Sequence, residues 1–206
     1  MPQLSPYISY KTDEKGNGYL EIALRGFPML RMSALNKGTA FTREERAAFS
    51  LEGLLPPRVT TLADQVRRVY QGYLKLDDYI EKYQYLRACQ ERSEVIFFKL
   101  LEQHLDEMMP IVYTPTVGKA VQHYSDLYQR PRGLTVSVLG NDHNDQVVDD
   151  YPWHDVRMIV ATDSSAILGI GDQGVGGLAI SIGKLALYTA GGGLSPFHTM
   201  PVCLDV

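Results

Sequence analysis

The sequence predicts an α/β protein in which an N-terminal helical layer is followed by part of a parallel sheet with crossover helices. Between residues 62 and 128, apolar side chains recur at intervals of three or four, which is the spacing of one helix face. After Pro131, short apolar runs are separated by longer segments, one of them glycine-rich and then helical, as in parallel strands joined by crossovers. We therefore divide the chain into a helical part with an extended arm, residues 1–130, and an α/β part, residues 131–206.

The first part begins with features of a hairpin and a short helix. Gly16-Asn17-Gly18 supplies a tight turn, and residues 19–23 alternate in polarity as a strand does. A short helix should begin after Thr42, because Thr42 and Glu45 have the spacing of a capping box. Residues 51–57 then predict a loop, which two prolines end.

Four amphipathic segments predict the helical layer. The first begins at Leu62 and the second follows Asp78. The third, residues 91–110, carries a broad apolar stripe and should end at Pro110, and the fourth begins after Thr116. The predicted inward faces comprise Leu62, Val66, Val69 and Tyr73; Tyr79, Tyr83 and Leu86; Ile96, Phe97, Leu100, Leu101, Leu105 and Met108; and Val117, Val121, Tyr124 and Tyr128.

Three apolar runs predict the strands of the sheet: residues 134–139, 155–162 and 200–206. The last run carries no polar tail and no closing helix. A chain that ends on a buried strand is unusual, so we expect this chain to be a fragment of a longer protein.

Composition and charge argue against several classes of function. The 206 residues carry a net charge of -4, which argues against nucleic acid or an anionic membrane as the main partner. Cys89 and Cys203 lie far apart and suggest neither a disulfide framework nor a zinc motif, and the five histidines, His143 among them, show no metal-site spacing. The chain shows no signal-peptide pattern and no uninterrupted apolar run of membrane-spanning length, so we expect a cytoplasmic protein.

The stretch 159–194 has the strongest features of a functional site. Lys184 is the only formal charge between residues 172 and 205, and Ile180 and Tyr188 lie four residues away on the same helix face. A lysine on an apolar face snorkels, pairs with an acid or loses its proton, and desolvation can supply an amine base. This pattern alone is more typical of a snorkelling lysine, but the glycine-rich segment before it favours a ligand site.

Residues 169–174 match G-x-G-x-x-G, so Gly169 and Gly171 are candidate cofactor-binding residues. The match is weak as a dinucleotide fingerprint. Asp205 follows later than the fingerprint's acidic residue should, and Asp172 inside the loop would repel a pyrophosphate.

Tyr113 lies between Pro110 and Pro115, just before a predicted helix, so its backbone is constrained. It would serve as a general acid if a cation such as Lys184 lay beside it. A core tyrosine next to a helix cap is the commoner meaning of this pattern.

Seven motifs together resemble the malic enzyme family, and they follow the family's order over roughly residues 28–206. That family comprises malate-decarboxylating oxidoreductases and the closely related malolactic enzymes. The motifs are NKGTAFT (36–42), GLLPP (53–57), QERSEVIFF (90–98), MPIVYTPTVG (109–118), RPRGL (130–134), VATDSSAILGIGDQG (160–174) and IGKLALYTAGGG (182–193).

The resemblance implies that L-malate is the substrate and assigns two catalytic residues. The family's tyrosine, here Tyr113, protonates the enol carbon after decarboxylation, and its lysine, here Lys184, accepts the proton of the C2 hydroxyl. It also implies NAD or NADP as cofactor, Mn²⁺ or Mg²⁺ to polarise the C2 oxygen, and a homodimer or homotetramer. The family's metal ligands and nucleotide-binding domain follow the strand on which this chain ends, so we expect no metal ligand here and no turnover by the fragment alone.

Two further positions are implied to bind substrate, Leu168 and Ala166. Ala166 is a departure, since malic enzymes usually carry there an arginine that holds a substrate carboxylate. Malolactic enzymes similarly lack this arginine; they convert L-malate to L-lactate and carbon dioxide with bound NAD and Mn²⁺. The remaining motifs look more like malic enzymes, so both reactions stay open. An oligomerisation module or a nucleotide-binding module without catalysis is the alternative from another class.

Overall fold

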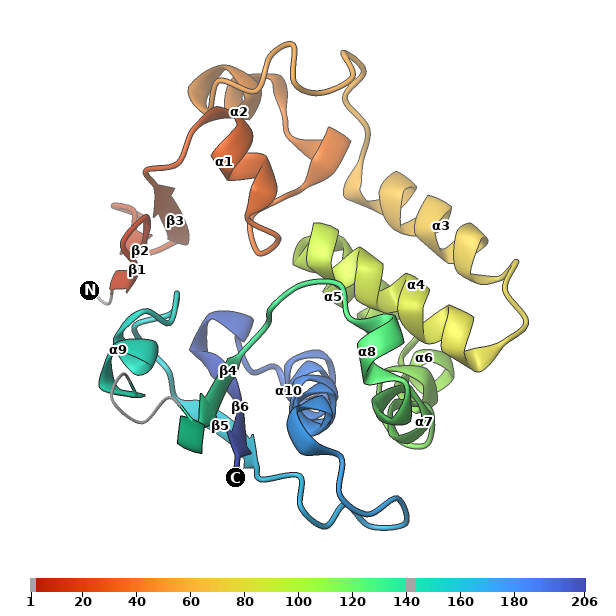
Figure 1. Ribbon diagram of the computed structural model, residues 1–206. Coiled ribbons are helices and arrows are strands. Elements are labelled where there is room, and N and C mark those ends of the chain that lie inside the picture. The colour runs from red at the N-terminus through yellow and green to blue at the C-terminus, as the bar shows by residue number, and fades with distance from the viewer. Residues whose placement is uncertain (1–2, 140–143) are drawn as a thin grey trace. The chain divides into compact units, whose positions relative to one another are not determined.

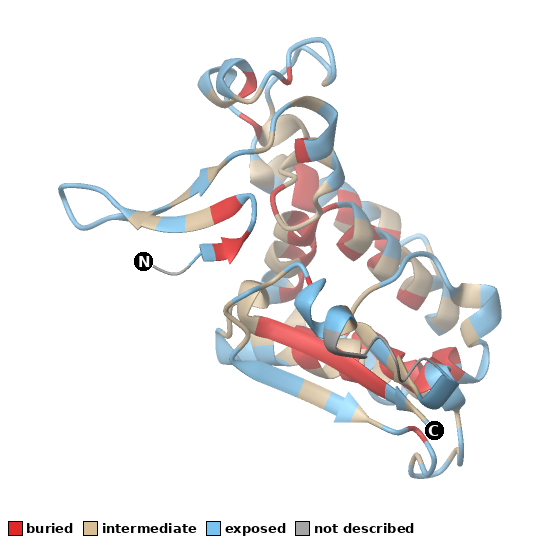
Figure 2. Cartoon of the chain, turned by 60° about the vertical axis from the view of Figure 1, so that its left-hand side comes forward, coloured by how far each residue is buried: buried red, intermediate tan, exposed pale blue. Residues whose placement is uncertain are grey.

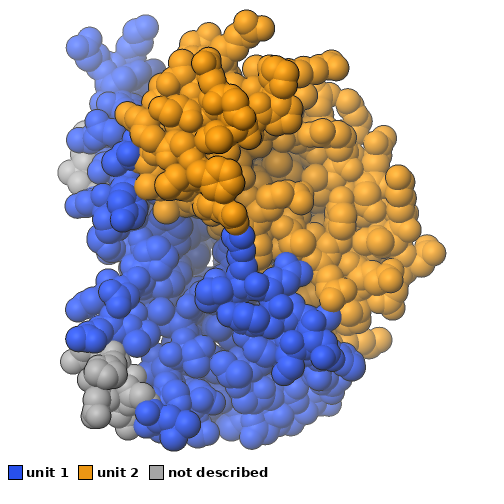
Figure 3. All heavy atoms as spheres, turned by 45° about the horizontal axis from the view of Figure 1, so that its top comes forward, with its two compact units in different colours: residues 1–23, 121–206 blue, residues 24–120 orange. Residues whose placement is uncertain are grey.

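The computed structural model describes residues 3–139 and 144–206, so His143 lies outside the described residues. The chain forms two compact units, which Figure 3 colours separately. One unit is Leu24–Ala120, and the other combines Met1–Ala23 with Val121–Val206. Among the helices that the structure describes, none has the length and apolar character needed to cross a bilayer. The division proposed at residue 130 remains a prediction.

The unit Leu24–Ala120 is helical, as Figure 1 shows. Its elements are α1 (Gly26–Arg31), the 3-10 turn η1 (Gly38–Ala40), α2 (Arg43–Ala48), α3 (Leu62–Tyr73), α4 (Tyr79–Arg92), α5 (Glu94–Gln103), α6 (Leu105–Val112) and most of α7 (Thr116–Gln122). Side chains cap several of these helices. The Thr42 hydroxyl accepts from the Glu45 N–H at 3.2 Å, and the Glu45 carboxylate accepts from the Thr42 N–H at 2.9 Å. The predicted capping box is therefore confirmed, and it satisfies donors that the first turn of α2 leaves free.

The prediction of one helix over residues 91–110 is wrong. α4 continues to Arg92, α5 ends at Gln103, and His104 separates α5 from α6 with φ -135° and ψ 38°. Pro110 lies inside α6 and does not end it. The φ of proline is compatible with a helix, so α6 continues to Val112 although Pro110 has no N–H to donate and its ring crowds the carbonyl four residues before it.

Most of the predicted apolar stripes form the core of this unit, where buried segments are red in Figure 2. The prediction is wrong for Tyr79, which is 56% exposed at the start of α4, and for Tyr128, which is 53% exposed at the end of α8 (Tyr124–Leu127) in the other unit. Their close packing excludes water from large side chains on several helices. The largest fully buried members on these stripes are Tyr73, Phe97, Leu86, Leu100, Leu101, Met108 and Val66.

Arg46 anchors the irregular chain around α2. Its side chain is only 5% exposed. The guanidinium donates to backbone carbonyls on both sides of α2, including Pro56 at 2.7 Å and Phe41 at 3.0 Å. Two further carbonyl acceptors are Thr39 and Arg58. Hydrogen bonds from one side chain therefore stabilise loops that have little secondary structure of their own.

The other unit begins with a small antiparallel sheet of β1 (Gln3–Ser5), β2 (Ile8–Thr12) and β3 (Gly18–Ile22). The predicted hairpin is confirmed, because β2 and β3 pair from Ile8↔Ile22 to Thr12↔Gly18. The sequence did not predict β1, which has only three residues and pairs with β2.

Three parallel strands form the second sheet, in the order β4-β6-β5. The predicted parallel sheet is therefore confirmed, and the last strand of the chain is its centre. The elements of this part are α8 (Tyr124–Leu127), β4 (Leu134–Ser137), α9 (Asn144–Asp149), β5 (Met158–Thr162), the 3-10 turn η3 (Gly174–Gly177), α10 (Leu178–Gly192), the 3-10 turn η4 (Pro196–His198) and β6 (Thr199–Asp205).

Both faces of β6 are covered, which explains its continuous apolar sequence. Met200 and Val202 pack with Tyr151 in a small core, and the Tyr151 hydroxyl donates to the Thr199 carbonyl at 2.9 Å. Helix α10, the crossover between β5 and β6, packs against both of these strands. Cys203 is fully buried, and burial raises the pKa of its thiol.

The buried face of α10 contains one uncompensated polar group. It consists of Leu178, Ala179, Ser181, Gly183, Leu185 and Ala186. The Ser181 side chain is 1% exposed, and its hydroxyl has no hydrogen-bond partner among residues 3–139 and 144–206. A buried hydroxyl without a partner lowers stability, because it loses its hydrogen bonds to water.

Replacing Arg46 with methionine should lower the free energy of unfolding by about 3 kcal/mol or more, because several buried carbonyls lose a charged donor. Urea unfolding followed by circular dichroism measures the change. Arg43→Met, on an exposed position of the same helix, is the matched control and should stay within about 0.5 kcal/mol of the parent. Equal, small effects of the two substitutions would contradict the anchoring role of Arg46.

Replacing Ser181 with alanine should leave the free energy of unfolding unchanged or raise it by about 1 kcal/mol, since the variant no longer buries an unpaired hydroxyl. Thermal and urea unfolding of both proteins measure the difference. A clear loss of stability in Ser181→Ala would mean that the hydroxyl is in fact satisfied.

Candidate functional site

The glycine-rich segment forms a tight turn between β5 and α10. Ile167 and Gly171 pair across it in an antiparallel bridge, and the Gly171 N–H donates to the Ile167 carbonyl at 2.9 Å. Gly169 and Gly171 have φ values of 82° and 74°, in the region that side chains rarely adopt, which explains why glycine occupies both positions. Leu168 lies at the tip with its side chain 99% exposed.

This turn differs from a dinucleotide-binding loop in its position along the chain. A Rossmann fingerprint follows its strand immediately. Here β5 ends at Thr162, well before Gly169, and the segment between them forms its own turn. The Asp172 carboxylate accepts the Gly174 N–H at 2.9 Å, so a negative charge occupies the loop where a pyrophosphate would bind.

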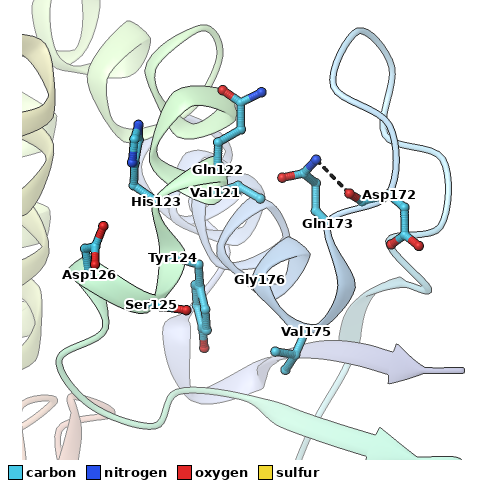
Figure 4. Close-up of a pocket in the computed structure, with 10 residues that line it drawn as sticks. All are labelled: Val121, Gln122, His123, Tyr124, Ser125, Asp126, Asp172, Gln173, Val175 and Gly176. Atoms are coloured by element: carbon cyan, nitrogen blue, oxygen red, sulfur yellow. Dashed lines mark hydrogen bonds between the residues drawn. The ribbon is translucent and has the colours of Figure 1, made fainter.

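A pocket of about 340 Å³ lies beside the end of this turn. One wall comes from the end of α7 and from α8, and the other comes from the turn, as Figure 4 shows. Gln173 is fixed there, because its side-chain amide donates to the carbonyls of Ile170 at 2.7 Å and Asp172 at 2.8 Å. The pocket wall includes the charged or titratable residues His123, Asp126 and Asp172. Two carboxylates in its wall make the pocket unsuited to an anion.

Lys184 lies in the middle of α10, on the same face as Ile180 and Tyr188. This face is only partly buried, and Tyr188 is 39% exposed. The Lys184 Nζ lies 5.4 Å from the centroid of the Tyr188 ring, a cation–π distance. The opposite side of α10 packs on the sheet, so the side that carries Lys184 is the less buried side of the helix.

Tyr113 ends α6 and is half-buried. Its N–H donates to the Met109 carbonyl at 3.0 Å, and its carbonyl accepts from the Val117 N–H at 2.8 Å, so hydrogen bonds hold its backbone on both sides. The Thr114–Pro115 peptide bond that follows is cis. Tyr113 belongs to the helical unit and Lys184 to the other, and each is described within its own unit.

The remaining candidate residues lie on the surface of the turn. Ala166 and Leu168 are both exposed, with no charged group of their own to hold a carboxylate. Within residues 3–139 and 144–206, the structure contains no group of three or more His, Cys, Asp or Glu side chains that could hold a metal ion. The described part of the chain therefore does not provide a metal site.

Sequence reasoning missed Ser164, which is completely buried and has a φ of 59°. Its carbonyl accepts from the Gln173 N–H at 3.0 Å, so it closes the turn at its base. A serine between an aspartate and another serine gives no pattern that would have marked it.

Comparison with known proteins identifies the family. The sequence model for the N-terminal domain of malic enzyme matches residues 90–206. The chain is 51% identical over 187 residues to the NAD-dependent malic enzyme of Pectobacterium carotovorum, and 48% identical over 187 residues to that of Acinetobacter baylyi. Each alignment covers 91% of this chain and 33% of the relative, so the chain spans about a third of the length of these relatives. Since the family model covers more than half of the sequence, this chain belongs to the malic enzyme family.

Proposed function

We propose that this chain forms the malate-binding, N-terminal part of an enzyme that converts L-malate and NAD to pyruvate, carbon dioxide and NADH. The observation that carries the proposal is the identity of about half of the residues with proteins named NAD-dependent malic enzymes. The partly exposed amine of Lys184 and the anchored Tyr113 support it, because the reaction needs a base and an acid of this kind.

Each of the two side chains performs one proton transfer. Lys184 accepts the proton of the C2 hydroxyl while C2 is oxidised to a ketone, and NAD, when bound, would accept the hydride that C2 loses. Loss of carbon dioxide then leaves an electron pair at C3, and Tyr113 donates a proton to that carbon. Lys184 gains one proton and Tyr113 loses one, so the total number of protons on the two side chains is unchanged after a turnover.

The remaining parts of the proposal rest on the family. NAD is taken from the printed names of the relatives, and bound NAD supplies the hydride acceptor. Mn²⁺ or Mg²⁺ is the metal of the family, but the described residues include no group of three or more His, Cys, Asp or Glu side chains that would hold such an ion. We also propose a cytoplasmic homodimer or homotetramer. The two free cysteines, both buried, are in keeping with a reducing compartment.

A malolactic reaction is the second candidate, and Ala166 is the observation that favours it. Without an arginine at this position, the substrate is held with one carboxylate clamp fewer. In that reaction the hydride returns to C2 of pyruvate and yields L-lactate, with no net NADH. An assay of the full-length protein with L-malate, NAD and Mn²⁺ distinguishes the two reactions. Pyruvate with NADH supports the first reaction, and lactate without net NADH supports the second.

Lys184→Ala and Tyr113→Phe should each lower kcat of the full-length enzyme by about 10²- to 10⁴-fold, the usual effect of removing a general acid or base. Steady-state production of NADH and pyruvate measures this. The two variants should differ in a partial reaction: Tyr113→Phe should also lose exchange of pyruvate methyl protons with deuterated water. Lys119→Ala and Tyr128→Phe, at exposed positions, are the matched controls. Near-normal kcat in both variants would contradict the assignment.

Ala166→Arg should lower KM for L-malate by about tenfold or more, since a hydrogen bond to a charged group contributes about 1.5–3 kcal/mol. Initial rates over a range of malate concentrations measure the effect. Ser165→Arg adds the same charge one residue away and serves as the control. If both arginines lower KM equally, general electrostatic attraction, and not a carboxylate clamp at residue 166, is responsible.

A further inference from the structure

We propose that Tyr188 is a positioning residue for Lys184, and that the face of its ring holds the lysine amine at one place on the less buried side of α10. This inference rests on the proposed role of Lys184 as the base. Both residues belong to one helix and to one compact unit, so the distance between them is defined within that unit.

The first observation is a direct contact between the two side chains. The Lys184 Nζ lies over the Tyr188 ring, 5.4 Å from its centroid, which is within cation–π range. Tyr188 follows Lys184 by four residues, and side chains on a helix lean toward its N-terminus. The ring therefore covers the helical turn from which the lysine stem emerges, and the contact follows from the spacing of the two residues.

The second observation concerns the other side chains of α10 within one turn of the amine. Lys184 is the only formal charge on this helix. Ile180 and Leu187 are apolar, and Ser181 belongs to the buried face that packs on the sheet. The Tyr188 ring carries negative potential on its face, so within α10 it is the side chain suited to attract an ammonium.

The third observation separates the ring from its hydroxyl. Tyr188 is 39% exposed, and its hydroxyl forms no hydrogen bond with the residues that the structure describes, 3–139 and 144–206. A tyrosine held by its hydroxyl would need such a partner. The ring face, and not the phenol group, is therefore the part of Tyr188 that acts on Lys184.

The contact matters because a lysine side chain is flexible. An amine that must remove one particular proton loses rate when it samples other places, and a fixed neighbour reduces that loss. In the proposed proton transfer, the O–H bond of the C2 hydroxyl breaks and an N–H bond forms on Lys184. The Tyr188 ring then faces the resulting ammonium, and Tyr188 itself neither gains nor loses a proton.

Tyr188→Leu removes the ring but keeps an apolar residue of good helix propensity, so the full-length variant should fold like the parent. We expect kcat to fall by at least about tenfold and KM for malate to change by less than about threefold, because the base is displaced while the substrate contacts remain. Tyr188→Phe keeps the ring face and should retain kcat within about twofold.

Tyr79→Leu is the matched control for these variants. It also removes an exposed tyrosine ring beside a lysine, since the Lys82 Nζ lies 5.9 Å from the centroid of the Tyr79 ring, and it should keep the parent kcat. A parent-like kcat in Tyr188→Leu would overturn the proposal. Equal losses in Tyr188→Leu and Tyr188→Phe would overturn it as well, because the hydroxyl would then be the group that matters.

A readout without malate keeps this test apart from the proposed function. The rate at which an N-hydroxysuccinimide ester acylates Lys184, relative to exposed Lys119, is measured by peptide mass spectrometry. Without the ring the amine is no longer held on one side, so the ratio should rise by about two- to fivefold in Tyr188→Leu, the factor that a cation–π contact at an exposed site contributes. In Tyr188→Phe the ratio should match that of the parent.

The two hypotheses therefore fail in different ways. If the parent enzyme does not decarboxylate malate, the proposed function fails, but the acylation ratio still tests whether Tyr188 holds the amine. An unchanged ratio in Tyr188→Leu would overturn the positioning role whatever the reaction is.

Discussion

The burial of strand β6 between β4 and β5 is the constraint on which the α/β part depends. A strand in the middle of a parallel sheet must be apolar on both faces, and each face must be covered by other elements. Tyr151 covers one face, and Cys203 and Ser164 meet between β6 and the start of α10. The position of α10, and therefore of Lys184, follows from how that helix lies against this strand. The turn at residues 163–177 connects the carboxyl end of β5 to the helix, which is the edge of a parallel sheet where ligands usually bind.

The two proposed proton-transfer residues are held in different ways. Lys184 lies in the middle of a long helix, and its Nζ is 5.4 Å from the centroid of the Tyr188 ring. Tyr113 occupies the junction between α6 and α7, where its peptide groups take part in hydrogen bonds at the end of one helix and the beginning of the next.

Sequence reasoning succeeded where one local pattern had one physical meaning. The capping box at Thr42, the hairpin turn at Gly16-Asn17-Gly18 and the three apolar strands are such cases, and all appear in the structure. It failed at His104 and Pro110, because tertiary packing decides whether a helix breaks before a proline or continues through it. Helical periodicity correctly predicted that Lys184, Ile180 and Tyr188 share one face of a helix. It could not predict which face of this almost wholly apolar helix packs on the sheet. Ser164 could not be found at all, since a left-handed φ at a serine has no sequence signature.

The carbonyl contacts of Arg46 give the helical unit an anchor that contains no carboxylate. A buried ion pair depends on a carboxylate, and acid weakens it as that carboxylate gains a proton. Here the acceptors are four peptide oxygens, which have no proton to gain in the pH range where a carboxylate titrates. Acidification should therefore weaken the surface ion pairs of this unit, such as Asp64 with Arg67, well before it reaches the anchor. The loops that Arg46 holds are therefore fixed by contacts that contain no ion pair.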